Sequence, residues 1–98
     1  MKLVWSPLAL ERMGEIADFI AQERPQVAEE WVEEVFAAVE NLVCFPGSGR
    51  VVPEVRREQI REMIHGNFRI IYRLDPAQVS ILTVRHARQL TGPEDIPG

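Results

Sequence analysis

Arginine and histidine side chains gather in the last third of this 98-residue chain. Residues 65 to 89 hold four arginines and two histidines but only one acid, Asp75. Arginine binds phosphate and carboxylate oxygens through paired N–H donors, and histidine exchanges protons near neutral pH. Two kinds of chemistry follow from such a set. One is the cleavage of RNA at a phosphodiester, and the other is the binding of an acidic partner by an arginine-rich surface.

RNA cleavage by a neighbouring 2′-OH needs a proton acceptor, a group that protonates the leaving oxygen, and cations beside the phosphate. The candidate residues are Arg61, Arg69, Arg85 and His86. A histidine at the end of a sheet can instead cap the sheet or bond a carbonyl. For His65, which directly precedes a turn, a structural role is the simpler interpretation.

A binding surface needs exposed cations and no proton transfer. The arginines predicted to contact a partner are Arg61, Arg69, Arg73, Arg85 and Arg88. For Arg69, an ion pair on the face of the sheet is an equally good interpretation. Because Arg85 and His86 are adjacent on a predicted strand, they point to opposite faces, and at most one of them shares the face of Arg69.

Charge is divided unevenly along the chain, whose formal net charge is −4. Residues 1 to 49 hold three basic and nine acidic side chains, residues 50 to 90 hold eight and four, and residues 91 to 98 add two acids. A basic face attracts anionic groups whatever the total charge. The overall acidity nevertheless disfavours an approach to RNA, and the acidic helices are most simply solvated faces.

Cysteine usage and hydropathy bear on the compartment. Cys44 is the only cysteine, so one chain can form neither an internal disulfide nor a thiolate metal cluster. The first 15 residues are not apolar enough for a secretory signal, and no segment approaches the length of a membrane span. We therefore expect a cytoplasmic protein with no membrane partner, no cofactor and no metal.

Two amphipathic helices are predicted in the first half of the chain. Ser6 and Pro7 are favourable residues at a helix start, and apolar residues recur at helical spacing from there to about residue 22. Pro25 begins a second amphipathic helix that ends near residue 43. The short break between them predicts a hairpin of antiparallel helices with an apolar face to cover.

Three strand-like runs follow and predict an antiparallel meander, which a strand at residues 2 to 5 could join. Gly66 and Asn67 suit a tight turn between the first two runs, and residues 75 to 78 suit the next turn. Alternation along the middle strand sorts its side chains onto two faces. The set predicted to face the helices is Phe68, Ile70, Tyr72 and Leu74. Arg69 and Arg73 then point the other way, onto a face that we expect to be cationic and exposed.

Four segments occur in a set order over about residues 2 to 89: WSPLALERMGEIADFI, FPGSGRVVPE, IREMIHGNFRIIYRL and ILTVRHARQ. In this order they resemble the RelE/ParE superfamily of bacterial toxins. The resemblance implies an α+β fold in which two N-terminal helices pack on one face of a three- to four-stranded antiparallel sheet. We expect one RelE/ParE-like domain at residues 1–90 and a flexible tail at residues 91–98.

The resemblance implies the toxin of a type II toxin-antitoxin module, also called a plasmid stabilisation module, which a cognate antitoxin neutralises. ParE-like members act on DNA gyrase and are not enzymes in that role, whereas RelE-like members are ribonucleases that cleave mRNA on the ribosome. A degenerate member that only binds its antitoxin is a third alternative. A homodimer and a toxin-antitoxin heterotetramer both fit the resemblance.

The ParE-like alternative fits the residues better. RelE-like nucleases share a basic cluster that usually includes lysines, together with a Tyr, His or Glu near the end of the sheet. Here the only lysine is Lys2, and the only tyrosine, Tyr72, falls on the predicted buried face. The closing VRHARQ resembles the VLHGRR of ParE-like toxins, with Arg85 and Ala87 as departures. We expect an acidic or amphipathic antitoxin segment to meet the arginine-bearing sheet face and the groove beside the helices.

Overall fold

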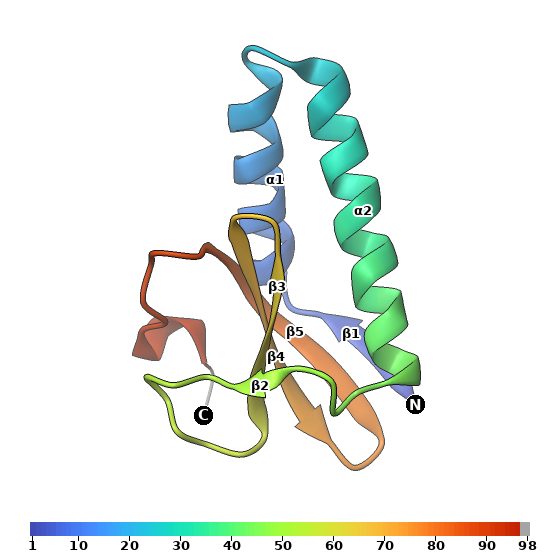
Figure 1. Cartoon of the computed structure of the whole chain (residues 1–98), viewed down its shortest axis with the longest axis vertical. Helices are drawn as coiled ribbons and strands as arrows, with labels where there is room; N and C mark the ends of the chain where they lie inside the picture. The colour runs from blue at the N-terminus through green and yellow to red at the C-terminus, as the bar shows by residue number, and fades with distance from the viewer. Residues whose placement is uncertain (97–98) are drawn as a thin grey trace.

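The structure is a computed structural model and describes residues 1–96. Two helices lie side by side against a sheet, and their joined ends project beyond it (Figure 1). In chain order the elements are β1 (Lys2–Trp5), α1 (Pro7–Ala21), α2 (Pro25–Cys44), β2 (Arg50–Val51), β3 (Ile60–His65), β4 (Phe68–Asp75), β5 (Gln78–His86) and the short 3-10 helix η1 (Pro93–Asp95). Among the described residues, no helix combines the length and the apolar character needed to span a bilayer.

Ser6 sets the start of α1. Its hydroxyl oxygen accepts a hydrogen bond from the Ala9 N–H at 3.0 Å, and the hydroxyl donates to the carbonyl oxygen of Leu82 at 2.8 Å. Pro7 occupies the first turn, where the missing N–H costs nothing, and Pro25 does the same in α2. Both predicted helices are therefore confirmed, and Ser6 also ties α1 to β5.

The sheet has five strands in the order β1-β5-β4-β3-β2. Its centre, formed by β3, β4 and β5, is the predicted antiparallel meander. The sheet exceeds the prediction in two respects, because β1 pairs with β5 in parallel and β2 adds a two-residue strand beside β3. A parallel pair needs a long connection, and the helical hairpin and the other strands supply it here.

Gly66 makes the tight turn between β3 and β4. Its φ is +58°, a left-handed value that glycine adopts without strain, and Asn67 is not among the described residues with positive φ. Positive φ at the first turn residue alone fits a type II′ turn, whose twist matches that of the flanking strands. The predicted turn is confirmed.

The main core lies between the helices and the sheet. Its buried side chains are Ala9, Met13, Trp31, Val35, Val39, Leu42, Ile70, Tyr72, Val79, Ile81 and Val84. Phe68 and Leu74 pack against this core as well. The four residues of β4 predicted to face the helices therefore do so.

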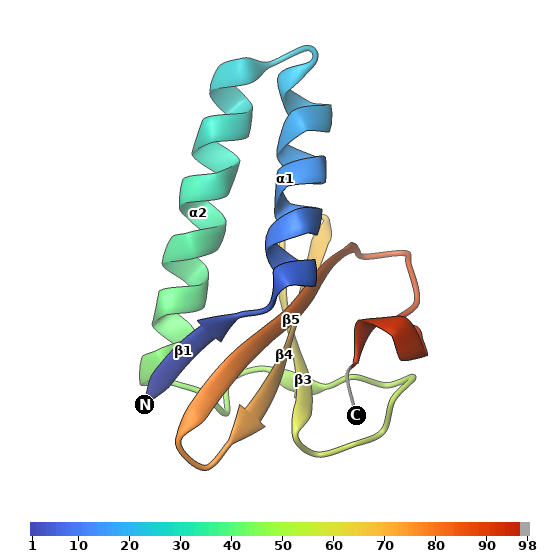
Figure 2. The same cartoon turned by 180° about the vertical axis from the view of Figure 1, so that it is seen from behind.

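A second, smaller core covers the opposite face of the sheet. Its members are Val52, Ile60, Ile71 and Leu82, with Val55 and Ile96 packed against them. The cover consists of the loop after β2 and the C-terminal residues, which lie beside each other in Figures 1 and 2. The prediction of an exposed cationic face is therefore wrong for Arg69, which is only 5% exposed. Alternation assigns a residue to a face but does not reveal what covers that face.

Part of the predicted flexible tail belongs to this cover. Asp95 is fully buried at the end of η1, and Ile96 packs on the second core. The flexibility of residues 91–98 stays a prediction, but residues 91 to 96 make specific contacts. Residues 97 and 98 lie outside the described residues.

Candidate functional site

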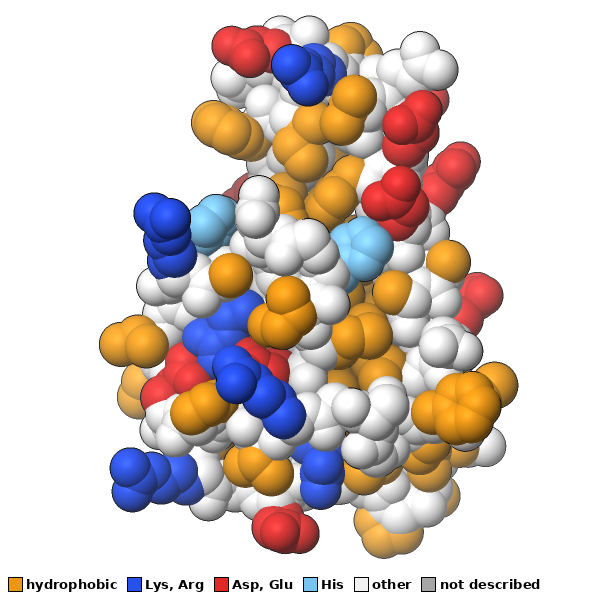
Figure 3. All heavy atoms as spheres, in the orientation of Figure 1, with side chains coloured by type: hydrophobic (Ala, Val, Ile, Leu, Met, Phe, Trp, Pro, Cys, Tyr) orange, Lys and Arg blue, Asp and Glu red, His pale blue; other side chains and the backbone are white. Residues whose placement is uncertain are grey.

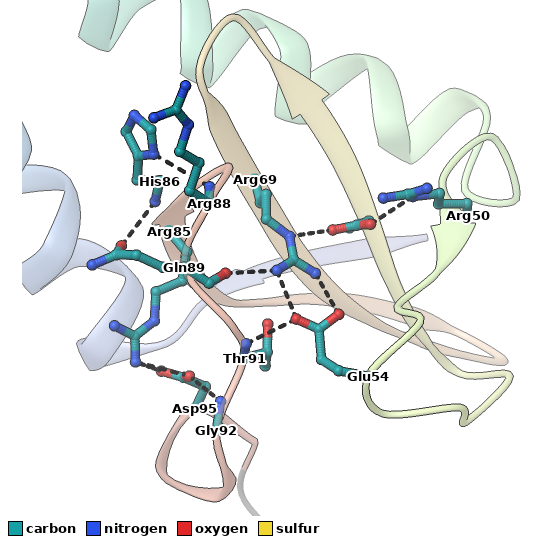
Figure 4. Close-up of polar contacts among 11 residues, drawn as sticks. Arg50, Glu54, Arg69, Arg85, His86, Arg88, Gln89, Thr91, Gly92 and Asp95 are labelled. Carbon is teal, nitrogen blue, oxygen red and sulfur yellow. Dashed lines mark hydrogen bonds and ion pairs between the residues drawn. The ribbon is translucent and has the colours of Figure 1, made fainter.

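Arg69, on β4, lies at the centre of a buried ion-pair network (Figure 4). Its two terminal nitrogens donate to the two carboxylate oxygens of Glu54 at 2.7 and 2.8 Å, and its Nε donates to Glu62 at 2.5 Å. One terminal nitrogen also donates to the carbonyl oxygen of Gln89 at 2.7 Å. Of the two interpretations for Arg69, the structure shows the ion pair on the sheet face.

The side chain of Glu62, on β3, is fully buried between two arginines. Arg50 bonds one of its carboxylate oxygens at 2.6 Å, and Arg69 bonds the other at 2.5 Å. Strand register explains both contacts. Glu62 is the partner of Arg50 on β2 and of Ile71 on β4, and Arg69 lies two positions before Ile71 on the same face of the sheet. A buried carboxylate is tolerated only when opposite charge and hydrogen bonds satisfy it, so Glu62 depends on both arginines.

Pairing shifts the pKa values of Glu54 and Arg69. The hydrogen bonds from Arg69 lower the pKa of Glu54 from 4.5 to about 2. Hydrogen bonding to Glu54 raises the pKa of Arg69 above its usual value, although burial opposes this effect. Both groups are therefore charged at neutral pH, and the Arg69 donors are occupied by acceptors of the same chain.

A second ion-pair cluster joins Asp95 to two arginines. Arg85 contacts both carboxylate oxygens of Asp95, at 2.9 and 3.0 Å. Arg12, from α1, also bonds Asp95 and donates to the Thr83 hydroxyl at 2.6 Å. Burial alone would raise the pKa of Asp95, but hydrogen bonds from the Gly92 N–H and from the two arginines together hold it below its usual value.

Residues 89–96, which we call the C-terminal strap, are held by both clusters. Arg69 binds the carbonyl of Gln89, and Glu54 accepts the Thr91 N–H at 2.9 Å. Asp95 fastens the other end of the strap to α1 and β5. The strap therefore covers the sheet face opposite the helices because arginines of that face bind it.

His86 points away from this cluster. In the register of β4 and β5, Arg85 is the partner of Arg69, whereas His86 is the partner of Phe68 on the helix-facing side. The His86 ring packs edge-on against Phe68, with 5.8 Å between ring centroids, and its Nδ1 accepts the Arg88 N–H at 3.3 Å. These contacts agree with a structural role for His86.

The other predicted residues lie apart from one another. Arg61 is the register partner of Tyr72, so it lies on the helix-facing side, where it donates to the carbonyl of Gly49 at 3.0 Å. Arg61 also lies four positions along the strand from the row that contains His86, a separation of about 13 Å. Arg73 shares the face of Arg69 and is partly exposed. The arginines and the histidine proposed for RNA cleavage therefore do not converge on one position.

His65, at the end of β3, makes a contact of a structural kind. Its Nε2 lies 3.4 Å from a carboxylate oxygen of Glu34 on α2. In register it is the partner of Phe68, as His86 is from the other side. The two histidines thus flank Phe68 at the end of the sheet nearest the β3–β4 turn.

An apolar groove of about 430 Å³ opens between α1 and the end of the sheet near that turn. Its lining residues are Glu15, Ile16, Phe19, Ile20, Asn67, Phe68 and His86. The Phe19 side chain is 74% exposed. Figure 3 shows both histidines on one face of the molecule, with hydrophobic side chains between and above them. An exposed aromatic residue among apolar neighbours is typical of a protein-binding surface.

Several of these residues were missed in the sequence. Glu54 and Glu62 are acids within the arginine-rich half of the chain, so opposite charges at close spacing were an available signal. Phe19 lies off the apolar stripe of the first helix, which is a signal for an exposed binding residue. The stripe consists of Ala9, Met13, Ile16, Ala17 and Ile20. For Asp95 the nearby Arg85 was an available signal, but Arg12, its second partner, lies 83 positions earlier in the sequence and carried none.

Comparison with known proteins now identifies the family. The family model described as the ParE toxin of type II toxin-antitoxin systems, parDE, matches residues 3–91. The chain belongs to the ParE toxin family. A relative from Sinorhizobium fredii (strain NBRC 101917 / NGR234), named "Putative toxin Y4kP", is 34% identical over 90 residues, which are 90% of each chain. The predicted membership of the RelE/ParE superfamily is confirmed.

Two solved structures share the fold of this ParE-family chain. A structure titled as the chromosomal ParDE system of P. aeruginosa superposes with a TM-score of 0.75 at 22% identity, over 90% of this chain and 97% of that chain. The RelBE2 toxin-antitoxin complex of Mycobacterium tuberculosis gives 0.56 at 21% identity, over 87% and 95%. At these identities the likeness concerns the fold alone, and it confirms the predicted α+β class.

Proposed function

We propose that this chain is the toxin of a type II toxin-antitoxin module, that a cognate antitoxin neutralises it, and that its target is DNA gyrase. Membership of the ParE family supports the first two parts. The observation that supports gyrase as the target is that both terminal nitrogens of Arg69 are bonded to Glu54. This pairing favours a toxin that binds its target over one that cleaves RNA.

A ribonuclease would need arginines that are available to an RNA phosphate. Arg69 and Arg85 share a face, but each is already bonded to carboxylates of its own chain. At Arg69 a phosphate could bind only by replacing two carboxylates of the same chain, one of them fully buried, so the exchange would bring little net gain. His86, the candidate acid or base, lies on the other face. This arrangement favours the binding of a protein target.

The apolar groove is the surface that we propose for the antitoxin. An amphipathic antitoxin segment would lay apolar side chains against Ile16, Phe19 and Phe68, the mode in which a helix binds a hydrophobic groove. Arg88 is exposed next to His86 at one side of the groove (Figure 4) and would meet acidic residues of that segment. Arg69, beneath the strap, supports antitoxin binding less well than the sequence suggested, because Glu54 and Glu62 already pair its charge.

Inducible expression in bacteria tests the target. We expect growth arrest, loss of negative supercoiling in a reporter plasmid, and inhibition of purified gyrase, while translated messages stay intact. Co-expression of the cognate antitoxin should restore growth. His86→Ala is the informative variant, because a gyrase-binding toxin should keep its activity when this histidine is removed.

Three results would contradict the proposal. Ribosome-dependent message cleavage that disappears in His86→Ala would identify a RelE-like nuclease. Normal growth of cells that contain folded protein would identify a non-toxic member of the family. Growth arrest with unchanged supercoiling and intact messages would point to a different target.

A further inference from the structure

The Asp95 carboxylate occupies an anion-binding site that earlier parts of the chain build. Arg12 comes from α1, and Thr83 and Arg85 come from β5. The Arg12 and Arg85 side chains are only 18% and 17% exposed, and Asp95 between them is fully buried. Two guanidinium groups in such a partly buried place repel each other unless an anion lies between them, so the pair forms a receptor for negative charge.

Asp95, which supplies the carboxylate, lies in the strap ten positions after Arg85. Nη2 of Arg85 makes the contacts with Asp95 and Glu94. Among the described residues, Nε of Arg85 is buried and has no hydrogen-bond partner. A guanidinium binds a carboxylate best when two of its nitrogens share the two oxygens, so the strap uses the receptor incompletely.

Hydrogen bonds and ion pairs, with one apolar contact, hold the strap in place. Ile96 packs on the second core, but Leu90 is 75% exposed and Pro93 and Glu94 are exposed as well. A ligand attached by a short linker has an effective concentration on the order of millimolar, so weak contacts suffice to keep it bound. A free ligand displaces the strap only when its concentration or its affinity overcomes this advantage, which an acidic segment with further contacts of its own can do.

The receptor lies next to the apolar groove. A hollow of about 180 Å³ beside Arg12 and Arg85 is lined by Glu15 and Ile16, and the same two residues line the groove. An extended segment that lies in the groove could thus place an acidic side chain at the two arginines. We propose that Arg12, Thr83 and Arg85 form a recognition site for an aspartate or glutamate side chain of a partner peptide, and that Asp95 occupies it in cis until such a segment displaces the strap.

A peptide carboxylate fits the receptor better than a nucleic acid does. The cis ligand is a single carboxylate at the end of the short helix η1, and the Gly92 N–H of the same segment donates to it at 2.8 Å. Glu15 faces the same hollow, and the formal net charge of the whole chain is −4, and both features repel a polyanion. The proposal concerns this binding site alone and does not depend on toxicity or on the gyrase target.

The experiment uses the full chain and a fluorescent peptide of residues 90 to 96, LTGPEDI. Anisotropy measures its binding to the wild type, to Asp95→Ala and to Glu94→Ala, a matched control that removes the adjacent exposed acid. Asp95→Ala frees the receptor from its cis ligand, so it should bind the peptide about tenfold more tightly than the other two, or better. The same peptide with Gln and Asn in place of its acids should not bind. Addition of Arg12→Gln to Asp95→Ala should abolish binding.

Circular dichroism first establishes whether Asp95→Ala folds. If it does not fold, hydrogen exchange in the wild-type protein tests the proposal instead. The Thr91 and Gly92 amides are held by Glu54 and Asp95, so their hydrogen exchange should accelerate in excess acidic peptide and stay unchanged with the amide peptide. Equal affinity of the folded Asp95→Ala and wild-type proteins, or unchanged exchange in the wild type at high peptide concentration, overturns the proposal. Displacement of the strap by a short RNA but not by the peptide assigns the site to phosphate and overturns it too.

Discussion

The guanidinium of Arg69 and the carboxylate of Glu54 meet through two hydrogen bonds, 2.7 and 2.8 Å long, on the sheet face opposite the helices. Glu54 lies in the loop between β2 and β3, 15 positions before Arg69. The pair therefore fastens this loop to the middle of the sheet and closes the second core beneath it. The sequence suggested that Arg69 was available to a ligand, but in the structure its side chain holds the loop on the sheet.

Replacement of Arg69 by alanine should destabilise the fold strongly. Among the described residues, Glu62 would stay buried with Arg50 as its remaining ion-pair partner, and Glu54 would lose its arginine. Removal of one partner from a buried ion pair typically costs about 3–5 kcal/mol. Urea unfolding followed by circular dichroism measures this cost. The control Arg88→Ala removes an exposed arginine and should change the free energy of unfolding by less than about 0.5 kcal/mol. Equal effects in the two variants would contradict a structural role for Arg69.

The elements of this fold were predictable because their signals are local. Ser6 and Pro7 mark the start of α1, Pro25 marks that of α2, and Gly66 marks the turn between β3 and β4, all as predicted. β2 was missed because two residues are too few to show a period. The parallel pairing of β1 was missed because it depends on the path of the whole chain.

The surroundings of Arg69 were not predictable in the same way. Alternation assigned this residue to the correct face, but it contains no information on what covers that face. The cover depends on the loop around Arg56, whose φ is +56°, and on pairs that are remote in sequence, such as Arg12 with Asp95. Such long-range ion pairs decide whether an arginine is exposed, and a single sequence does not reveal them.

Gly49 should not tolerate a side chain. A Cβ at this position would lie 2.6 Å from the carbonyl oxygen of Glu62 and would collide with the Tyr72 hydroxyl, which accepts the Gly49 N–H at 3.0 Å. Gly49→Ala should therefore destabilise the protein by about 1–3 kcal/mol, as overpacked sites do. Gly47→Ala is the matched control, because the space around that residue is open. Thermal melting compares the two, and similar losses would show that crowding at Tyr72 is not the cause.

Acid should weaken the loop and the strap through Glu54. Hydrogen bonds from Arg69 lower its pKa from 4.5 to about 2 in the folded protein. The unfolded chain therefore takes up the proton first as the pH falls. The contribution of this carboxylate to stability is complete above pH 4.5 and is lost as the pH falls towards 2. Urea unfolding at a series of pH values should show the free energy of unfolding declining in this window.

Glu54→Gln separates this titration from general acid denaturation. The amide keeps the size of the side chain but carries no charge at any pH, so the variant should be less stable than the wild type at neutral pH. The difference between the two proteins should shrink as the pH falls from 4.5 towards 2, where the wild-type carboxylate becomes neutral as well. A difference that stays constant over this range would rule out Glu54 as the titrating group.

Phe19→Ala should weaken antitoxin binding with little effect on folding. The side chain lines the apolar groove and is 74% exposed, so its removal should change the free energy of unfolding by less than about 0.5 kcal/mol. An aromatic anchor at the centre of an interface typically contributes about 2 kcal/mol or more, which corresponds to a roughly 30-fold increase in Kd. Isothermal titration calorimetry with the purified antitoxin measures this change.

Phe45→Ala is the matched control for this prediction. Phe45 is 63% exposed, so it resembles Phe19 in type and exposure, but it follows the end of α2 and does not line the groove. A general loss of exposed aromatic surface would weaken binding in both variants, whereas a specific contact in the groove would weaken it in Phe19→Ala alone. Equal Kd values for the two variants would therefore exclude the groove as the antitoxin site.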